Sequence, residues 1–101
     1  MKLLTIVVHK ESEQLLLKPV RELQQISGFT YSHAEGHGSH IQSDGFLQAR
    51  DQLIGHSPRI RIDILADPES CQLVVERIKE TEGLKGHAVY WITPVEESGH
   101  L

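Results

Sequence analysis

Three histidines lie close together in a glycine-rich segment, and imidazole is a common ligand of transition metals. His33, His37 and His40 are spaced by four and three residues, with Gly36 and Gly38 between them. Imidazole nitrogens bind Zn²⁺, Cu²⁺, Ni²⁺ or Co²⁺, and glycines allow the backbone to fold around such an ion. The same residues also fit an exposed polar loop without a metal, because spacing in a loop does not fix ligand geometry. A metal site and a solvated loop are therefore both open interpretations.

Cationic side chains that can hold an anion occur in two further places. Arg59 and Arg61 alternate along an extended segment, and guanidinium groups bind carboxylates or phosphates in a bidentate manner. An equally good interpretation pairs them with Asp63 or with an acid of a neighbouring chain. The second place is a short turn with backbone N–H groups and one ammonium, which can cradle an anion or simply end a helix. It consists of Gly83, Lys85 and Gly86.

The sequence offers no arrangement typical of an enzyme. A nucleophile needs a positioned base and a third group that orients the base. The serines, the histidines and the single cysteine are scattered, without local spacing of that kind. We therefore expect a protein that binds rather than one that catalyses.

The elements expected to position these residues follow the order βαββαβ. Short β-branched or alternating runs predict strands, and apolar residues spaced by three and four predict helices. We expect strands over 3–8, 29–33, 58–65 and 87–92, and helices over 11–26 and 67–83. Pro19 should kink the first helix or mark a restart at Lys18, whereas Asp67 and Pro68 are typical of a helix start. The stretch 36–57 has no sustained period, and long loops in small domains often carry function.

This order predicts an α+β, ferredoxin-like fold, a four-stranded antiparallel sheet with two helices on one face. Both crossovers must be right-handed, which places the two helices on the same side. The other side of the sheet then has no cover, although the first strand, 3–8, is apolar on both faces. We therefore expect the uncovered side to pack against other subunits.

Composition limits the classes of function and partner. The chain has 101 residues, 10 Lys+Arg against 14 Asp+Glu, a net charge of −4 and one cysteine. It fits a single small domain, 1–101, that lacks the basic surface needed for nucleic acid. One cysteine excludes an intrachain disulfide. The apolar run near the N-terminus is too short for membrane insertion or a signal peptide, which predicts a cytoplasmic protein.

Several segments together resemble the PII-like family of trimeric signalling proteins. The run from Pro58 to Ile64 resembles the opening of that family's third strand. The sequences 20–23 and 28–30 resemble its first helix and the entry to its second strand. The excursion 36–57 takes the place of the mobile T-loop, 82–87 that of the nucleotide-contacting B-loop, and 93–101 that of a C-terminal tail. The ending is similar to a branch whose genes tend to accompany heavy-metal efflux systems.

The resemblance implies a non-enzymatic homotrimer that binds a small effector in clefts between subunits and signals through the loop. Its partner would be a membrane transporter or efflux component. To the effector site we assign Gly36, Gly38, Arg59, Arg61, Gly83, Lys85 and Gly86. An adenine nucleotide is one implied effector, but no Lys or Arg follows Lys85, where PII proteins hold ATP phosphates with arginines. The alternative function is transition-metal binding through His33, His37 and His40.

Overall fold

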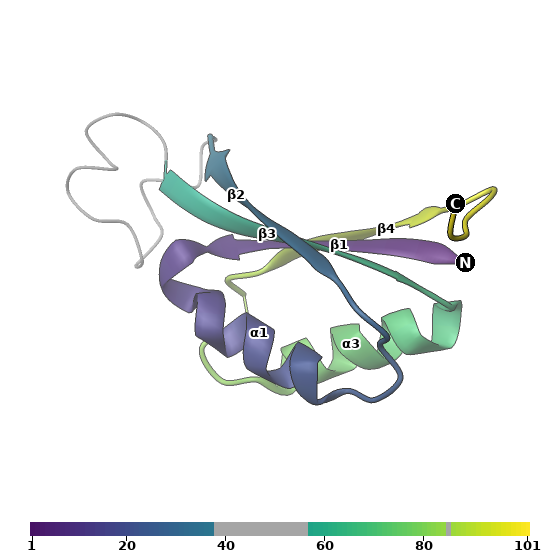
Figure 1. Ribbon diagram of the computed structural model, residues 1–101. Coiled ribbons are helices and arrows are strands. Elements are labelled where there is room, and N and C mark those ends of the chain that lie inside the picture. Colours follow the sequence, from purple (N-terminus) through teal and green to yellow (C-terminus); the bar gives the residue numbers. More distant parts are fainter. Residues whose placement is uncertain (38–56, 85) are drawn as a thin grey trace.

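The protein, described here by a computed structural model, combines one sheet with two main helices (Figure 1). The structure describes residues 1–37, 57–84 and 86–101. In chain order the elements are β1 (Lys2–His9), the 3₁₀ turn η1 (Lys10–Ser12), α1 (Glu13–Glu22), β2 (Thr30–Gly36), β3 (Ser57–Ala66), α3 (Pro68–Glu80) and β4 (Val89–Pro94).

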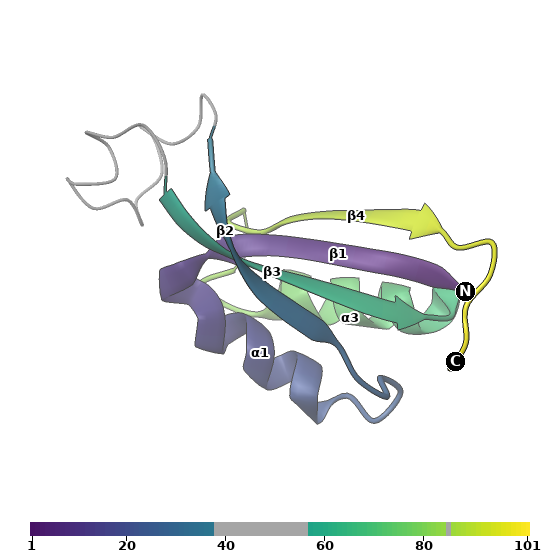
Figure 2. The same ribbon diagram turned by 45° about the horizontal axis from the view of Figure 1, so that its top comes forward.

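The sheet has the strand order β2-β3-β1-β4, and each neighbouring pair is antiparallel. Both helices lie against the same face of this sheet, as Figures 1 and 2 show from two directions. The predicted α+β, ferredoxin-like fold is therefore confirmed. Because β1 occupies an inner position between β3 and β4, its backbone is paired on both sides.

The core lies between the sheet and the helices. In β3, Ile60, Ile62 and Ile64 are fully buried, as their strict alternation with charged residues predicts. Every second residue of β1 joins them, and α1 and α3 each contribute one apolar stripe. The core residues that these three elements contribute are Leu4, Ile6, Val8, Leu16, Leu17, Val20, Cys71, Val74, Val75 and Ile78.

Helix α3 begins where the sequence predicts it. The Asp67 carboxylate accepts a hydrogen bond of 2.7 Å from the backbone N–H of Ser70, and Pro68 occupies the first turn. The same backbone donor lowers the pKa of Asp67. An N-terminal N–H that would otherwise have no partner in the helix is thereby satisfied, which stabilises the start of α3.

Other element boundaries differ from those predicted. Helix α1 ends at Glu22 instead of residue 26, because Leu23 is extended (φ −82°, ψ 111°) while its N–H still bonds to the Val20 carbonyl. The helix continues through Pro19 without a restart. Strand β4 covers residues 89–94 instead of 87–92, so it includes the first two residues of the segment expected as the tail. Strand β2 reaches Gly36 and β3 starts at Ser57, which places both ends of the expected excursion in the sheet.

Candidate functional site

One face of the sheet carries apolar side chains although neither helix covers it. Val89 is 55% exposed, and Leu65 and Trp91 are each 40% exposed. Antiparallel sheets that face water normally present polar residues there, so this composition is typical of a face that packs against another layer. We call it the uncovered face. It includes Leu3, Thr5, Val7, Thr30, Ser32, Ala34, Arg59, Arg61, Asp63, Leu65, Val89, Trp91 and Thr93, with its apolar residues mainly on β1, on β4 and at the end of β3.

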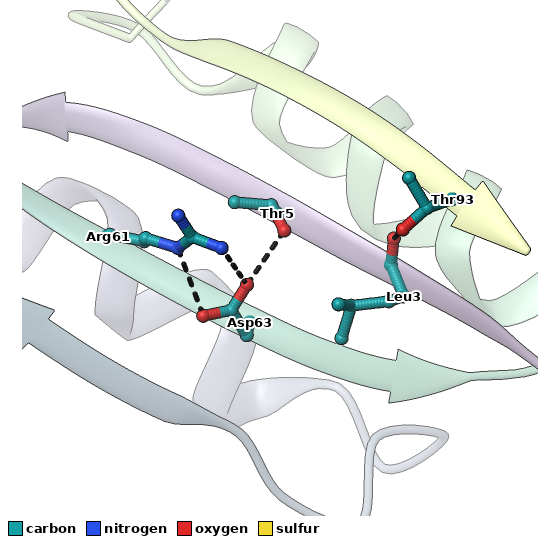
Figure 3. A network of polar contacts seen from close by, with 5 residues as sticks. All are labelled: Leu3, Thr5, Arg61, Asp63 and Thr93. Atoms are coloured by element: carbon teal, nitrogen blue, oxygen red, sulfur yellow. Dashed lines mark hydrogen bonds and ion pairs between the residues drawn. The ribbon is translucent and has the colours of Figure 1, made fainter. Parts of the chain in front are cut away.

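A polar network lies in the middle of the uncovered face (Figure 3). Arg61 donates to both carboxylate oxygens of Asp63, from Nε at 3.2 Å and from Nη2 at 3.3 Å. Thr5, which is fully buried, donates from Oγ1 to Asp63 at 2.7 Å. The Arg61 guanidinium also lies 5.8 Å from the centroid of the Trp91 ring, within the range of a cation–π contact. Of the two roles considered for Arg61, the structure therefore provides the pairing with Asp63 within the same chain.

The network controls the ionisation of Asp63. Partial burial by itself raises the pKa of this carboxyl group. The hydrogen bonds from Arg61 and Thr5 outweigh burial, and the net pKa lies below its ordinary value. The charged form of Asp63 is therefore favoured in the folded protein.

Replacing Asp63 by asparagine is expected to cost stability at neutral pH but not in acid. A carboxyl group with a lowered folded pKa stabilises the fold above its unfolded pKa of about 3.9, and this contribution is lost as pH falls through the folded pKa. At pH 7 we expect Asp63→Asn to reduce the free energy of unfolding by about 1–2 kcal/mol. Urea denaturation at pH 7, 5 and 3 should show the difference shrinking toward zero. A constant difference would mean that charge is not the cause.

The registers bring two of the predicted effector residues, Gly36 and Arg59, to one end of the sheet. At this end β1 finishes with His9 opposite Arg59, and β2 finishes with Gly36 opposite Ser57. Strand β4 starts here as well, with Val89 opposite Val7. We call this the loop end of the sheet. Residues that are far apart in the sequence thus converge because all four strands begin or finish here.

Arg59 and Gly36 are in close contact at the loop end. The Arg59 Nε donates to the Ser57 hydroxyl at 3.1 Å. A Cβ atom on Gly36 would fall on this guanidinium group, only 2.6 Å from its Cζ, so glycine is what allows the side chain to lie there. In the part of the chain that the structure describes, the terminal nitrogens of Arg59 have no hydrogen-bond partner. Such nitrogens can bind a carboxylate or phosphate.

The predicted anion-binding turn follows α3. Gly83 and Gly86 have positive φ angles, of 94° and 80°, which side-chain-bearing residues rarely adopt. Leu84, between them in sequence, is buried and anchors the turn to the core. Lys85 lies outside the described residues, as do Gly38 and His40. The turn leads directly into β4, whose first residue is at the loop end.

The two described histidines of the predicted metal site lie along β2 and just beyond it. His33 is in β2, where its ring meets Tyr31 edge-on at 6.0 Å. His37 lies 3.5 Å from the Glu35 carboxylate, and both side chains are largely exposed. Across residues 1–37, 57–84 and 86–101, no three His, Cys, Asp or Glu side chains are grouped closely enough to hold a metal ion. The predicted role of His40 falls outside these ranges.

Three buried hydroxyl groups were not predicted as site residues. Thr5 binds Asp63, and Ser57 accepts from Arg59. Ser12 is buried in η1, and its Oγ has no hydrogen-bond partner among the described residues. Ser57 directly precedes Pro58, and an extended alternation would have placed it on the face of Arg59 and Arg61. The places of Thr5 and Ser12 depend on neighbours that are distant in the sequence.

The fold and the loop end define a small ferredoxin-like α+β protein with an open sheet face. The chain belongs to the family described as "Protein of unknown function (DUF3240)", whose family model matches residues 1–101. A search of curated proteins gave no match.

Two solved structures share the fold. A DUF3240 family protein from Shewanella baltica has a TM-score of 0.75 at 16% sequence identity, over 99% of this chain and 94% of the other. A candidate PII-like signalling protein from Thermus thermophilus has a TM-score of 0.61 at 23% identity, over 90% of this chain and 80% of the other. Among the described residues, no helix has the length and apolar character required to cross a membrane.

Proposed function

We propose that this protein is a non-enzymatic, PII-like regulator that assembles as a homotrimer through its uncovered face. The observation that carries the proposal is the apolar composition of this face beside a cluster with an available guanidinium group. A domain of 101 residues has a small core, and burying Leu65, Val89 and Trp91 between subunits would add to it. The number three comes from the resemblance to the PII-like family.

The effector is expected to be a small anion bound at the loop end, in the cleft between two subunits. Arg59 supplies a guanidinium that is held in place by Ser57 and is close to Gly36. The turn that contains Gly83 and Gly86 precedes β4, which starts at the loop end of the sheet. Binding there would act on the segment that joins Gly36 to Ser57, and through this segment on a partner. The resemblance points to a cytoplasmic protein and to a membrane transporter, as in heavy-metal efflux, as this partner.

The experiment that tests this function measures oligomer mass and ligand-induced stabilisation on the same sample. Light scattering should give three times the chain mass of 11.4 kDa. A panel of adenine nucleotides, cyclic nucleotides and small dicarboxylates should then include one compound that raises Tm. At 100 times its Kd, a ligand adds about 2.7 kcal/mol, which is about 10–20 °C for a domain of this size. A monomer at working concentration would contradict the proposal.

A second candidate function is transition-metal binding, favoured by the contact between His37 and Glu35. These side chains already lie within 3.5 Å of each other at the end of β2, and His33 is on the same strand. Titration with Zn²⁺, Cu²⁺, Ni²⁺ and Co²⁺ should give heat in the wild-type protein and none after His33, His37 and His40 are replaced by alanine. Unchanged affinity in the triple variant would dismiss these histidines as the site.

A further inference from the structure

A pocket lies on the other side of the sheet from the uncovered face. It has a volume of about 200 Å³ and lies between α3, the turn after α3, and strands β1 and β4. Its innermost walls are apolar and buried, formed by Ile6, Val75, Ile78 and Leu84. The rest of the lining reaches solvent and is formed by Lys79, Gly86, Ala88 and Tyr90. We call it the helix-side pocket.

The pocket exists because the helices do not extend over the edge strand. Helix α3 packs against β1 and β3, the two central strands. Tyr90 of β4 pairs with Ile6 and thus faces the helix side, but it remains 46% exposed. The edge of the core is therefore open between α3 and β4, and the turn that carries Leu84 closes one end of this opening.

We propose that the helix-side pocket binds a small monocarboxylate with an apolar tail of about six to eight carbon atoms. An apolar cavity of about 150 Å³ in a protein stays dry and accepts benzene, so a pocket of about 200 Å³ accommodates a slightly larger tail. Its innermost walls, formed by Ile6, Val75, Ile78 and Leu84, offer such a tail dispersion contacts with apolar side chains. Pockets for small ligands commonly combine apolar walls with one or two polar groups that fix orientation.

Lys79 selects the head group of the ligand. Lys79 lines the pocket, and its ammonium lies 3.7 Å from the Glu76 carboxylate, with both side chains about 60% exposed. Exposed pairs of this kind are weak. A carboxylate anchored by a buried tail therefore competes well with Glu76 for Lys79. It follows that Glu76 opposes the ligand, and that removing its charge should strengthen binding.

A series of straight-chain carboxylates tests the pocket directly. Butanoate, hexanoate, octanoate and decanoate are titrated into the ¹⁵N-labelled protein, and amide shifts are followed at Ile78, Leu84, Ala88 and Tyr90. Each buried methylene should raise affinity about fourfold, and the gain should stop once the pocket is full, near octanoate. Affinity that keeps rising to decanoate, shifts spread over the whole molecule, or no binding at all would overturn the proposal.

Single substitutions distinguish the contribution of the apolar tail to binding from that of the carboxylate head group. Ala88→Phe fills the pocket from a partly exposed position and should weaken hexanoate at least tenfold, whereas Leu73→Phe, on α3 outside the pocket, should not. Ala88→Leu serves as a smaller replacement if the phenylalanine variant fails to fold. Lys79→Gln should weaken hexanoate severalfold and Glu76→Gln should strengthen it, while 1-hexanol binds all three proteins equally. Equal effects on hexanoate and hexanol would overturn the role of Lys79.

The helix-side pocket shares Gly86 with the proposed effector site, but it does not include Arg59. Arg59 is at the loop end on the opposite face, so Arg59→Met should remove the effector response and leave hexanoate binding unchanged. Loss of both in this variant would show that the carboxylate binds at the loop end, which overturns the assignment of the helix-side pocket.

Discussion

If the protein forms the proposed trimer through its uncovered face, replacing Val89 by glutamate is expected to give monomers without unfolding the chain. Val89 is 55% exposed in β4, so a charged side chain there costs the single subunit little, within about 0.5 kcal/mol. In an assembly through the uncovered face the same carboxylate would be buried. An unpaired buried carboxylate costs several kcal/mol, and a threefold assembly contains three of them. The free-energy cost of burying these carboxylates should exceed the free energy that the subunit contact contributes to assembly.

Light scattering across a range of concentrations checks this expectation. The mass should fall from three times 11.4 kDa to 11.4 kDa, while the far-UV circular dichroism spectrum stays unchanged. The matched control is Leu73→Glu, which places the same charge on an exposed position of α3, on the side away from the uncovered face. This control should remain trimeric. If Val89→Glu remains trimeric as well, the subunits meet through another surface.

The fold could be predicted from sequence wherever a pattern is both local and strong. The alternation of Ile60, Ile62 and Ile64 with charged residues identified β3, and Asp67 with Pro68 identified the start of α3. The end of α1 could not be predicted in this way. Leu16, Val20 and Leu23 continue a helical spacing past the point where the backbone becomes extended. Side-chain periodicity reports which face is buried and contains little information about where the backbone bonds stop.

The candidate site was predictable in its parts but not in its assembly. Arg59 and Arg61 share a strand face, and sequence reasoning treated them as equivalent. The structure separates them, because Arg61 is engaged by Asp63 and Trp91 whereas Arg59 lies against Gly36. Both arginines lie in β3 between β1 and β2, so the difference depends on their position along the strand, which the register sets: Arg59 is near the end of the sheet where Gly36 pairs with Ser57. The predicted roles of Gly38, His40 and Lys85 concern residues outside the described ranges.

Replacing Gly36 by alanine is expected to weaken the proposed effector binding strongly while leaving the fold intact. The new Cβ would occupy the place of the Arg59 guanidinium, which is the mobile end of a long side chain and can move away. The three atoms nearest to this Cβ all belong to the Arg59 side chain, so we expect the free energy of unfolding to change by less than about 1 kcal/mol. The hydrogen bond from Arg59 to Ser57 should be lost.

The effect on binding should be large because the displaced group carries the charge. A hydrogen bond to a charged partner contributes about 1.5–3 kcal/mol, which corresponds to a factor of about 10–150 in Kd. Calorimetry with the compound that stabilises the wild-type protein should therefore give a similar loss for Gly36→Ala and Arg59→Met. Gly28→Ala is the matched control, because nothing lies within 4 Å of a Cβ at that position. Wild-type affinity in Gly36→Ala would show that the observed place of Arg59 is not the one that binds the effector.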